Sequence, residues 1–89
     1  MTTETHIASL ILRCDPARLD AVRAGLRALP QTETALADPT GKLVLLMETD
    51  REAAIAETLT TLQLMEGVAS AALVYHHTLT DDEEEGTAR

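Results

Sequence analysis

The sequence predicts an α+β domain in which four antiparallel strands and two helices follow one another in the order β-α-β-β-α-β. Two short, nearly continuous apolar runs, residues 6–13 and 42–48, are typical of strands in the middle of a sheet. Each run leads into a segment whose apolar residues have helical spacing. A further strand follows each helix, so residues 6–37 and 42–77 look like two copies of one β-α-β unit.

The first unit begins with the strand at residues 6–13. Asp15 offers a side-chain oxygen to the free amides of a helix, and Pro16 fits the first helical turn because its missing N–H is no loss there. Pro30 marks the end of this helix, and residues 32–37 alternate weakly between polar and apolar, as in an edge strand. The apolar stripe of the helix has spacings of three, four and three: Leu19, Val22, Leu26 and Leu29.

A hairpin is expected between the two units. Residues 38–41, Asp-Pro-Thr-Gly, have Pro and Gly at the positions that a type I turn prefers, and residues 42–48 form the strand that follows.

The second helix is preceded by a capping signal. Thr49 and Glu52 have the spacing of a capping box, and Asp50 is an alternative cap. Gly67 is placed to take the left-handed conformation that closes a helix, and residues 68–77 form the fourth strand. The apolar stripe of this helix has four members: Ile55, Leu59, Leu62 and Met65.

Right-handed crossovers arrange these elements as a ferredoxin-like plait, a four-stranded antiparallel sheet of order 4-1-3-2 with both helices on one face. The sequence thus predicts a single domain at residues 1–77. Residues 78–89 contain five consecutive acids with little to bury, and we expect them to form an acidic, disordered tail.

The other face of this sheet, called the open face below, has no helix to cover it, yet the central strands are apolar on both faces. A slip of one residue in the assignment would exchange the two faces. The positions of the polar residues along the strands favour the assignment given in the next two sentences. The side chains expected on the helix side are Leu10, Leu12, Leu43, Leu45 and Met47. Those expected on the open face are Ile7, Ser9, Ile11, Arg13, Lys42, Val44, Leu46, Glu48, Ser70, Ala72, Val74 and His76.

Composition excludes several classes of partner and activity. The chain has 89 residues and a net charge of −8, a sign that disfavours nucleic acid and anionic membranes. The central strands lack the aromatic residues on which RNA-binding plaits stack bases, and the chain has no Asn, which acylphosphatases of this fold use. One cysteine, no basic leader and no long apolar run indicate a cytoplasmic protein without a membrane span.

Two side-chain groups raise the question of chemistry. His6 and His76 lie where the first and fourth strands meet, with Glu48 at the same sheet end, but this set lacks the ligand number of a metal site. Cys14 lies at the opposite end of the first strand from the histidines, so a nucleophile pair is not expected. We therefore expect a binding module without catalytic residues, metal or cofactor.

Three segments resemble the NapD family, the cytoplasmic chaperones of the periplasmic nitrate reductase catalytic subunit. They are Ser-Leu-Ile-Leu at 9–12, Asp-Pro-Thr-Gly-Lys-Leu-Val at 38–44, and Glu-Gly-Val-Ala-Ser-Ala-Ala-Leu-Val-Tyr-His at 66–76. The resemblance implies that the protein binds the twin-arginine signal peptide of the nitrate reductase precursor. It also implies that the protein delays export until the molybdenum cofactor is inserted.

The open face is then the expected peptide platform. Glu48 and the acids at 81–85 would face the arginines, and His76 is carried over from the Tyr-His ending of the family segment. The expected site consists of Ile7, Ser9, Ile11, Val44, Leu46, Glu48, Val74 and His76. A small-molecule-sensing plait that oligomerises through its sheet is the alternative, and a monomer or a weak homodimer is expected in solution.

Overall fold

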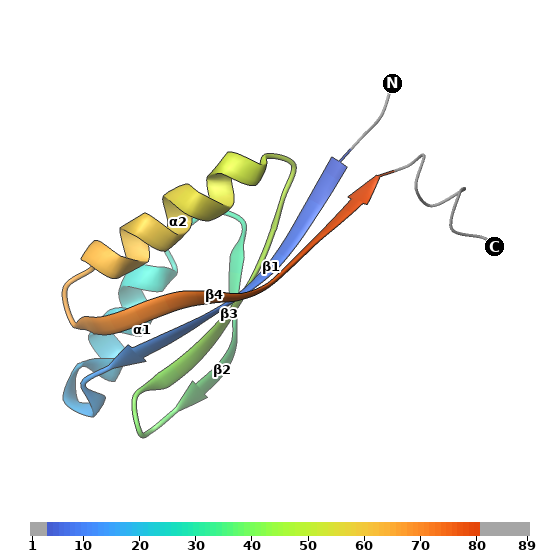
Figure 1. Cartoon of the computed structure of the whole chain (residues 1–89). Helices are drawn as coiled ribbons and strands as arrows, with labels where there is room; N and C mark the ends of the chain where they lie inside the picture. Colours follow the sequence, from blue (N-terminus) through green and yellow to red (C-terminus); the bar gives the residue numbers. More distant parts are fainter. Residues whose placement is uncertain (1–3, 81–89) are drawn as a thin grey trace.

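The computed structural model describes residues 4–80, which form one antiparallel sheet with two helices on one of its faces (Figure 1). The elements are β1 (Glu4–Cys14), a short 3₁₀ helix η1 (Pro16–Arg18), α1 (Leu19–Leu26), β2 (Thr32–Asp38), β3 (Lys42–Thr49), α2 (Glu52–Leu64) and β4 (Val68–Thr80). The strand order β2-β3-β1-β4 is the predicted order read from the other edge, so the ferredoxin-like fold is confirmed.

The core lies between the sheet and the helices. Burial alternates along β1 and β3, because successive side chains of a strand point to opposite faces. Leu10 and Leu45, at the centre of these strands, are completely buried, and Val22 of α1 and Leu62 of α2 pack in the same cluster. The predicted phase of the two central strands is confirmed.

The start of the first helical segment follows the prediction, and its end does not. The Asp15 carboxylate accepts a hydrogen bond from the Ala17 N–H at 3.0 Å, and Pro16 opens η1. However, α1 ends at Leu26 rather than at Pro30. The Leu29 N–H already bonds three residues back, to the Leu26 carbonyl, because a proline disfavours helical backbone in the residue before it.

The predicted hairpin between β2 and β3 is present. The Gly41 N–H donates to the Asp38 carbonyl at 2.8 Å. The Asp38 carboxylate accepts from both the N–H and the hydroxyl of Thr40, and these bonds, the backbone one foremost, lower the pKa of the Asp38 carboxyl.

The capping box predicted at the start of α2 is wrong. The Thr49 hydroxyl accepts from the Arg51 N–H at 3.2 Å, two residues on, and Arg51 still has extended backbone. Glu52 is consequently the first residue of the helix and not the third, so it cannot reach back to close the box. At the other end the helix finishes at Leu64, and Gly67, with φ of 93°, turns the chain into β4.

The fourth strand is longer than expected. It continues past residue 77 to Thr80, and its last residues pair with the first residues of β1. Together the two strands extend past the helices as a two-stranded ribbon (Figure 1). The acidic run at 81–85, and the rest of the expected tail from 81 onward, lie outside the described residues.

Candidate functional site

The open face is organised in rows that run across the four strands. Residues paired across neighbouring strands share a face, so the register identifies the members of each row. Row one contains Glu48, Ile7 and His77; row two contains Glu33, Leu46, Ser9 and Tyr75; row three contains Leu36, Val44, Ile11 and Ala72; row four contains Asp38, Lys42, Arg13 and Ser70.

These rows leave a large apolar surface uncovered. Row three is apolar throughout, and Leu46 and Leu36 remain 41% and 47% exposed. Six residues of the expected binding site lie on this face: Ile7, Ser9, Ile11, Val44, Leu46 and Glu48. A contiguous apolar patch of this kind is typical of an interaction site.

The prediction that His76 lies on the open face is wrong. Leu10 pairs with Leu73, but Ser9 pairs with Tyr75, so Val74 is one extra residue in β4. This β-bulge exchanges the faces of everything that follows it. His76 therefore pairs with buried Ala8 on the helix side, whereas Val74 has no partner on β1 and is 54% exposed.

The same bulge brings two unexpected residues to the open face. Tyr75 pairs with Ser9 and His77 pairs with Ile7, and their rings lie 6.3 Å apart and nearly parallel. Strict alternation along the strand would place both on the helix side, and nothing local in the sequence marks the bulge. Glu33 and Leu36 were also missed, because β2 alternates weakly and contains its own irregularity between Thr34 and Leu36.

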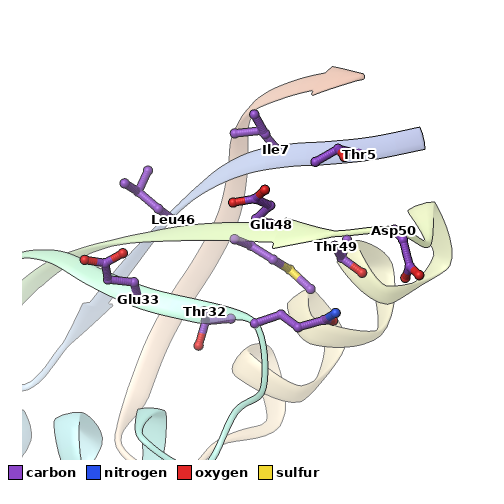
Figure 2. Close-up of a pocket in the computed structure, with 10 residues that line it drawn as sticks. Thr5, Ile7, Thr32, Glu33, Leu46, Glu48, Thr49 and Asp50 are labelled. Carbon is purple, nitrogen blue, oxygen red and sulfur yellow. The ribbon is translucent and has the colours of Figure 1, made fainter. Parts of the chain in front are cut away.

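A pocket of about 660 Å³ lies at the end of the open face that holds rows one and two (Figure 2). It forms at the edge of the sheet, where β2 begins opposite Met47 and the last two residues of β3, Glu48 and Thr49, have a strand only on their β1 side. Figure 2 shows Ile7, Leu46 and Glu48 pointing to the same side of the sheet. The lining residues are Thr5, Ile7, Gln31, Thr32, Glu33, Leu46, Met47, Glu48, Thr49 and Asp50.

This pocket combines apolar walls with carboxylates. Glu33, Glu48 and Asp50 line it, and none of its lining residues is Lys or Arg. The ion pairs found within residues 4–80 use other acids, namely Glu4, Glu57 and Glu66. The carboxylates of the pocket are therefore available to a cationic group from outside.

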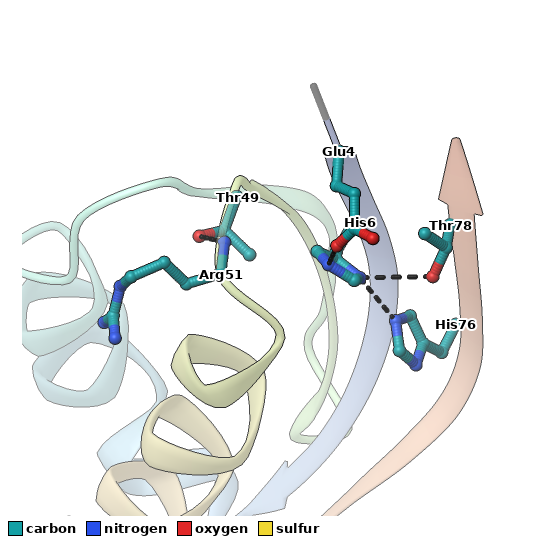
Figure 3. A network of polar contacts seen from close by, with 6 residues as sticks. All are labelled: Glu4, His6, Thr49, Arg51, His76 and Thr78. Atoms are coloured by element: carbon teal, nitrogen blue, oxygen red, sulfur yellow. Dashed lines mark hydrogen bonds and ion pairs between the residues drawn. The ribbon is translucent and has the colours of Figure 1, made fainter. Parts of the chain in front are cut away.

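A separate polar network lies on the helix side of β1 and β4 (Figure 3). His6 is almost completely buried; its Nε2 is 3.2 Å from a Glu4 oxygen, and its Nδ1 is 3.2 Å from His76 Nε2 and 3.1 Å from the Thr78 hydroxyl. Because a carboxylate only accepts, the Nε2 of His6 donates to Glu4. Glu48 lies on the opposite face of the sheet. In the part of the chain that the structure describes, no group of three or more His, Cys, Asp or Glu side chains is placed so that it could hold a metal ion.

The single cysteine is a buried core residue. Cys14 lies at the end of β1 away from His6, and burial, together with the charge of Asp15, raises the pKa of its thiol. A raised pKa keeps the thiol protonated at neutral pH, and the protonated form is a poor nucleophile.

Comparison with known proteins identifies a matching family and several relatives of this chain. The sequence model of the NapD protein family matches residues 5–80. Chaperone NapD of Escherichia coli (strain K12) is 30% identical over 87 residues, which are 97% of this chain and 95% of the relative. Chaperone NapD of Haemophilus influenzae is 31% identical over 72 residues, which are 80% of this chain and 77% of the relative.

A solved structure agrees with these sequence matches. The solution structure of the E. coli Tat proofreading chaperone protein NapD superposes with a TM-score of 0.76 at 29% identity, covering 86% of this chain and 82% of that one. The family match, the curated relatives and the shared fold confirm the resemblance seen in the sequence: this chain belongs to the NapD family.

Proposed function

We propose that this protein is a maturation chaperone that binds the twin-arginine signal peptide of the periplasmic nitrate reductase precursor on the open face. Binding would delay export until the molybdenum cofactor is inserted. The observation that carries the proposal is the uncovered apolar open face. At one end of this face lie carboxylates that form no ion pair within residues 4–80. The relatives also support it. Those matched by sequence are named as chaperones, and the matched solved structure is that of a Tat proofreading chaperone.

The chemistry of the ligand matches this surface. A twin-arginine signal peptide carries an Arg-Arg pair followed by an apolar stretch. As a helix, the apolar stretch can lie on Ile11, Val44 and Leu46, which form the centre of the open face. Val74, exposed in the bulge beside this face, extends the apolar surface toward the edge.

The arginines of the peptide need carboxylates close to that apolar surface. Glu48 is exposed, lines the pocket and lies on β3 two residues beyond Leu46. A guanidinium binds a carboxylate through two parallel hydrogen bonds, so a carboxylate on a strand orients the arginine as well as attracting it. His76 faces the other side of the sheet and is not part of the proposed contact surface.

The proposal places the protein in the cytoplasm, where the precursor waits before export, and assigns it no catalytic step. Neither helix in residues 4–80 is long and apolar enough to cross a membrane.

Calorimetric titration of the full chain with a synthetic nitrate reductase signal peptide tests the proposal. We expect binding with a negative heat-capacity change, and weaker binding of a twin-arginine peptide from an unrelated enzyme. Leu46→Glu puts a charge in the apolar patch and should reduce the affinity at least about tenfold. Leu64→Glu is the matched control, because Leu64 is 80% exposed on α2, away from the open face.

The outcomes are distinct. Equal affinities for the wild type, Leu46→Glu and Leu64→Glu would exclude the open face as the binding site. Absence of binding to either peptide would remove the proposed function. If the wild type then sedimented as a dimer and Leu46→Glu as a monomer, the alternative, a sensing plait that oligomerises through its sheet, would take its place.

A further inference from the structure

We infer that the open face accepts the signal peptide in one direction only. The arginines lie at the end with Glu33 and Glu48, and the apolar stretch runs toward Arg13 and Lys42. This inference rests on the proposed function and adds to it the polarity of the bound peptide. Three features of the open face support it: the charge of its rows, their spacing and the position of the pocket.

The charges of the open face are separated along the strands. Rows one and two contain two carboxylates, Glu48 and Glu33, and no Lys or Arg. Row three has no charged member, and row four contains the two cations Lys42 and Arg13. An apolar band therefore separates an acidic end from a basic end.

The one carboxylate of the basic end does not remove its positive character. Asp38 lies opposite Lys42, but its carboxylate oxygen already accepts hydrogen bonds from the backbone N–H and the hydroxyl of Thr40. Neither Arg13 nor Lys42 takes part in an ion pair found within the described ranges. Arginines placed at this end would meet like charges.

The length of the face is matched to an apolar helix. Row one and row four are six residues apart along a strand, or about 20 Å, which is the length of a helix of about 13 residues. A helix that starts at the acidic end puts its positive N-terminal pole near Glu48 and its negative C-terminal pole near Arg13. The reverse direction opposes both the side-chain charges and the helix dipole.

The pocket lies at the same end as the carboxylates. It is lined by both Glu33 and Glu48, with Ile7 and Leu46 as apolar walls (Figure 2). An arginine side chain needs such a combination, since its methylene stem packs on apolar groups while the guanidinium pairs with a carboxylate. Row one also contains His77, whose ring stacks on Tyr75 of row two.

Paramagnetic broadening in NMR spectra of the full chain tests the direction. Two synthetic nitrate reductase signal peptides carry a nitroxide label, one beside the arginine pair and the other at the C-terminal end of the apolar stretch. The first label should broaden the amide signals of Glu33 and Glu48, and the second those of Arg13 and Lys42. A reduced, diamagnetic label on each peptide is the control.

Each result decides between the two proposals. The reversed pattern, or equal broadening of both ends by both labels, would overturn the inferred direction and leave the proposed function intact. Lack of binding, or broadening confined to residues outside the open face, would overturn the proposed function and this inference with it.

Charge variants provide a second test. Glu33→Gln combined with Glu48→Gln should weaken a twin-arginine peptide at least about tenfold and a twin-lysine peptide less, because only arginine makes the bidentate contact. Asp20→Asn, which removes an exposed carboxylate from α1, is the matched control and should change neither affinity. Equal weakening of both peptides by the double variant would contradict a bidentate arginine contact at this end.

Discussion

Gly41 lies where the β2–β3 hairpin meets the end of β1. It is buried, its φ is 102°, and its carbonyl accepts a hydrogen bond from the Cys14 N–H at 2.8 Å. A Cβ atom at this position would collide with the carbonyl oxygen of Cys14. Glycine is required here for two reasons, the left-handed backbone and the close approach of another strand.

Gly41→Ala should lower the free energy of unfolding by at least about 2 kcal/mol, because it adds backbone strain to a collision with main-chain atoms. Urea unfolding followed by circular dichroism measures the change. Gly25→Ala is the control: Gly25 lies in α1, an added Cβ would be 3.4 Å from the Met65 sulfur, and alanine favours helix. We expect it to be neutral or stabilising. Equal stability of the two variants would contradict the argument.

Among the secondary-structure elements, β4 does most to determine the composition of the open face. Its bulge at Val74 turns Tyr75 and His77 to the open face and His76 to the helix side, where it meets His6. Between Glu4 and Arg13 of β1, pairing with β4 is regular on both sides of the bulge. Val74 is therefore an extra residue that makes no pair in this ladder.

Deletion of Val74 should therefore be tolerated within about 1 kcal/mol, and the Ala8–His76 and Ser9–Tyr75 pairs should persist. Cross-strand NMR contacts and thermal unfolding report these two properties. Deletion of Val44, which pairs with Ile11 in the β1–β3 ladder, is the control and should lose pairs and stability, since that ladder contains no extra residue to take the vacated position. If the Val74 deletion moved His76 to the open face, the bulge would not be what sets the face.

At the scale of the whole molecule, charge and hydrophobicity are distributed unevenly. The chain carries a net charge of −8, the helices cover one sheet face, and the apolar residues of the other face remain exposed. The negative charge of the whole chain acts at long range, whereas apolar contacts act only after encounter. A cationic, apolar peptide should thus be attracted first by charge and then held by burial.

Association with the twin-arginine peptide should consequently slow by about tenfold or more when ionic strength rises from about 0.01 M to about 0.15 M. Stopped-flow fluorescence with a labelled peptide measures this rate. A peptide in which both arginines are replaced by glutamine should show a smaller dependence. The same salt dependence for the two peptides would mean that the arginine charges do not guide the encounter.

The order of elements, the two layers and the phase of the central strands can all be predicted from the sequence without knowledge of the structure. These features follow from local and repeating properties: apolar runs in β1 and β3, helical spacing in α2, and the turn preferences of residues 38–41. The same phase placed Ile11, Val44 and Leu46 on the open face, so the centre of the candidate site was also predictable.

Which side chains of the edge strands join that site depends on strand pairing in the folded molecule. The bulge at Val74 depends on how β4 aligns with β1, about sixty residues away, and β2 has its own irregularity against β3. The hydroxyl of Thr49 likewise bonds Arg51 before the helix begins, because β3 continues to Thr49 instead of ending one residue earlier. Strand register arises from pairing between distant segments, and a shift of one residue exchanges the two faces, so alternation within one strand cannot predict it.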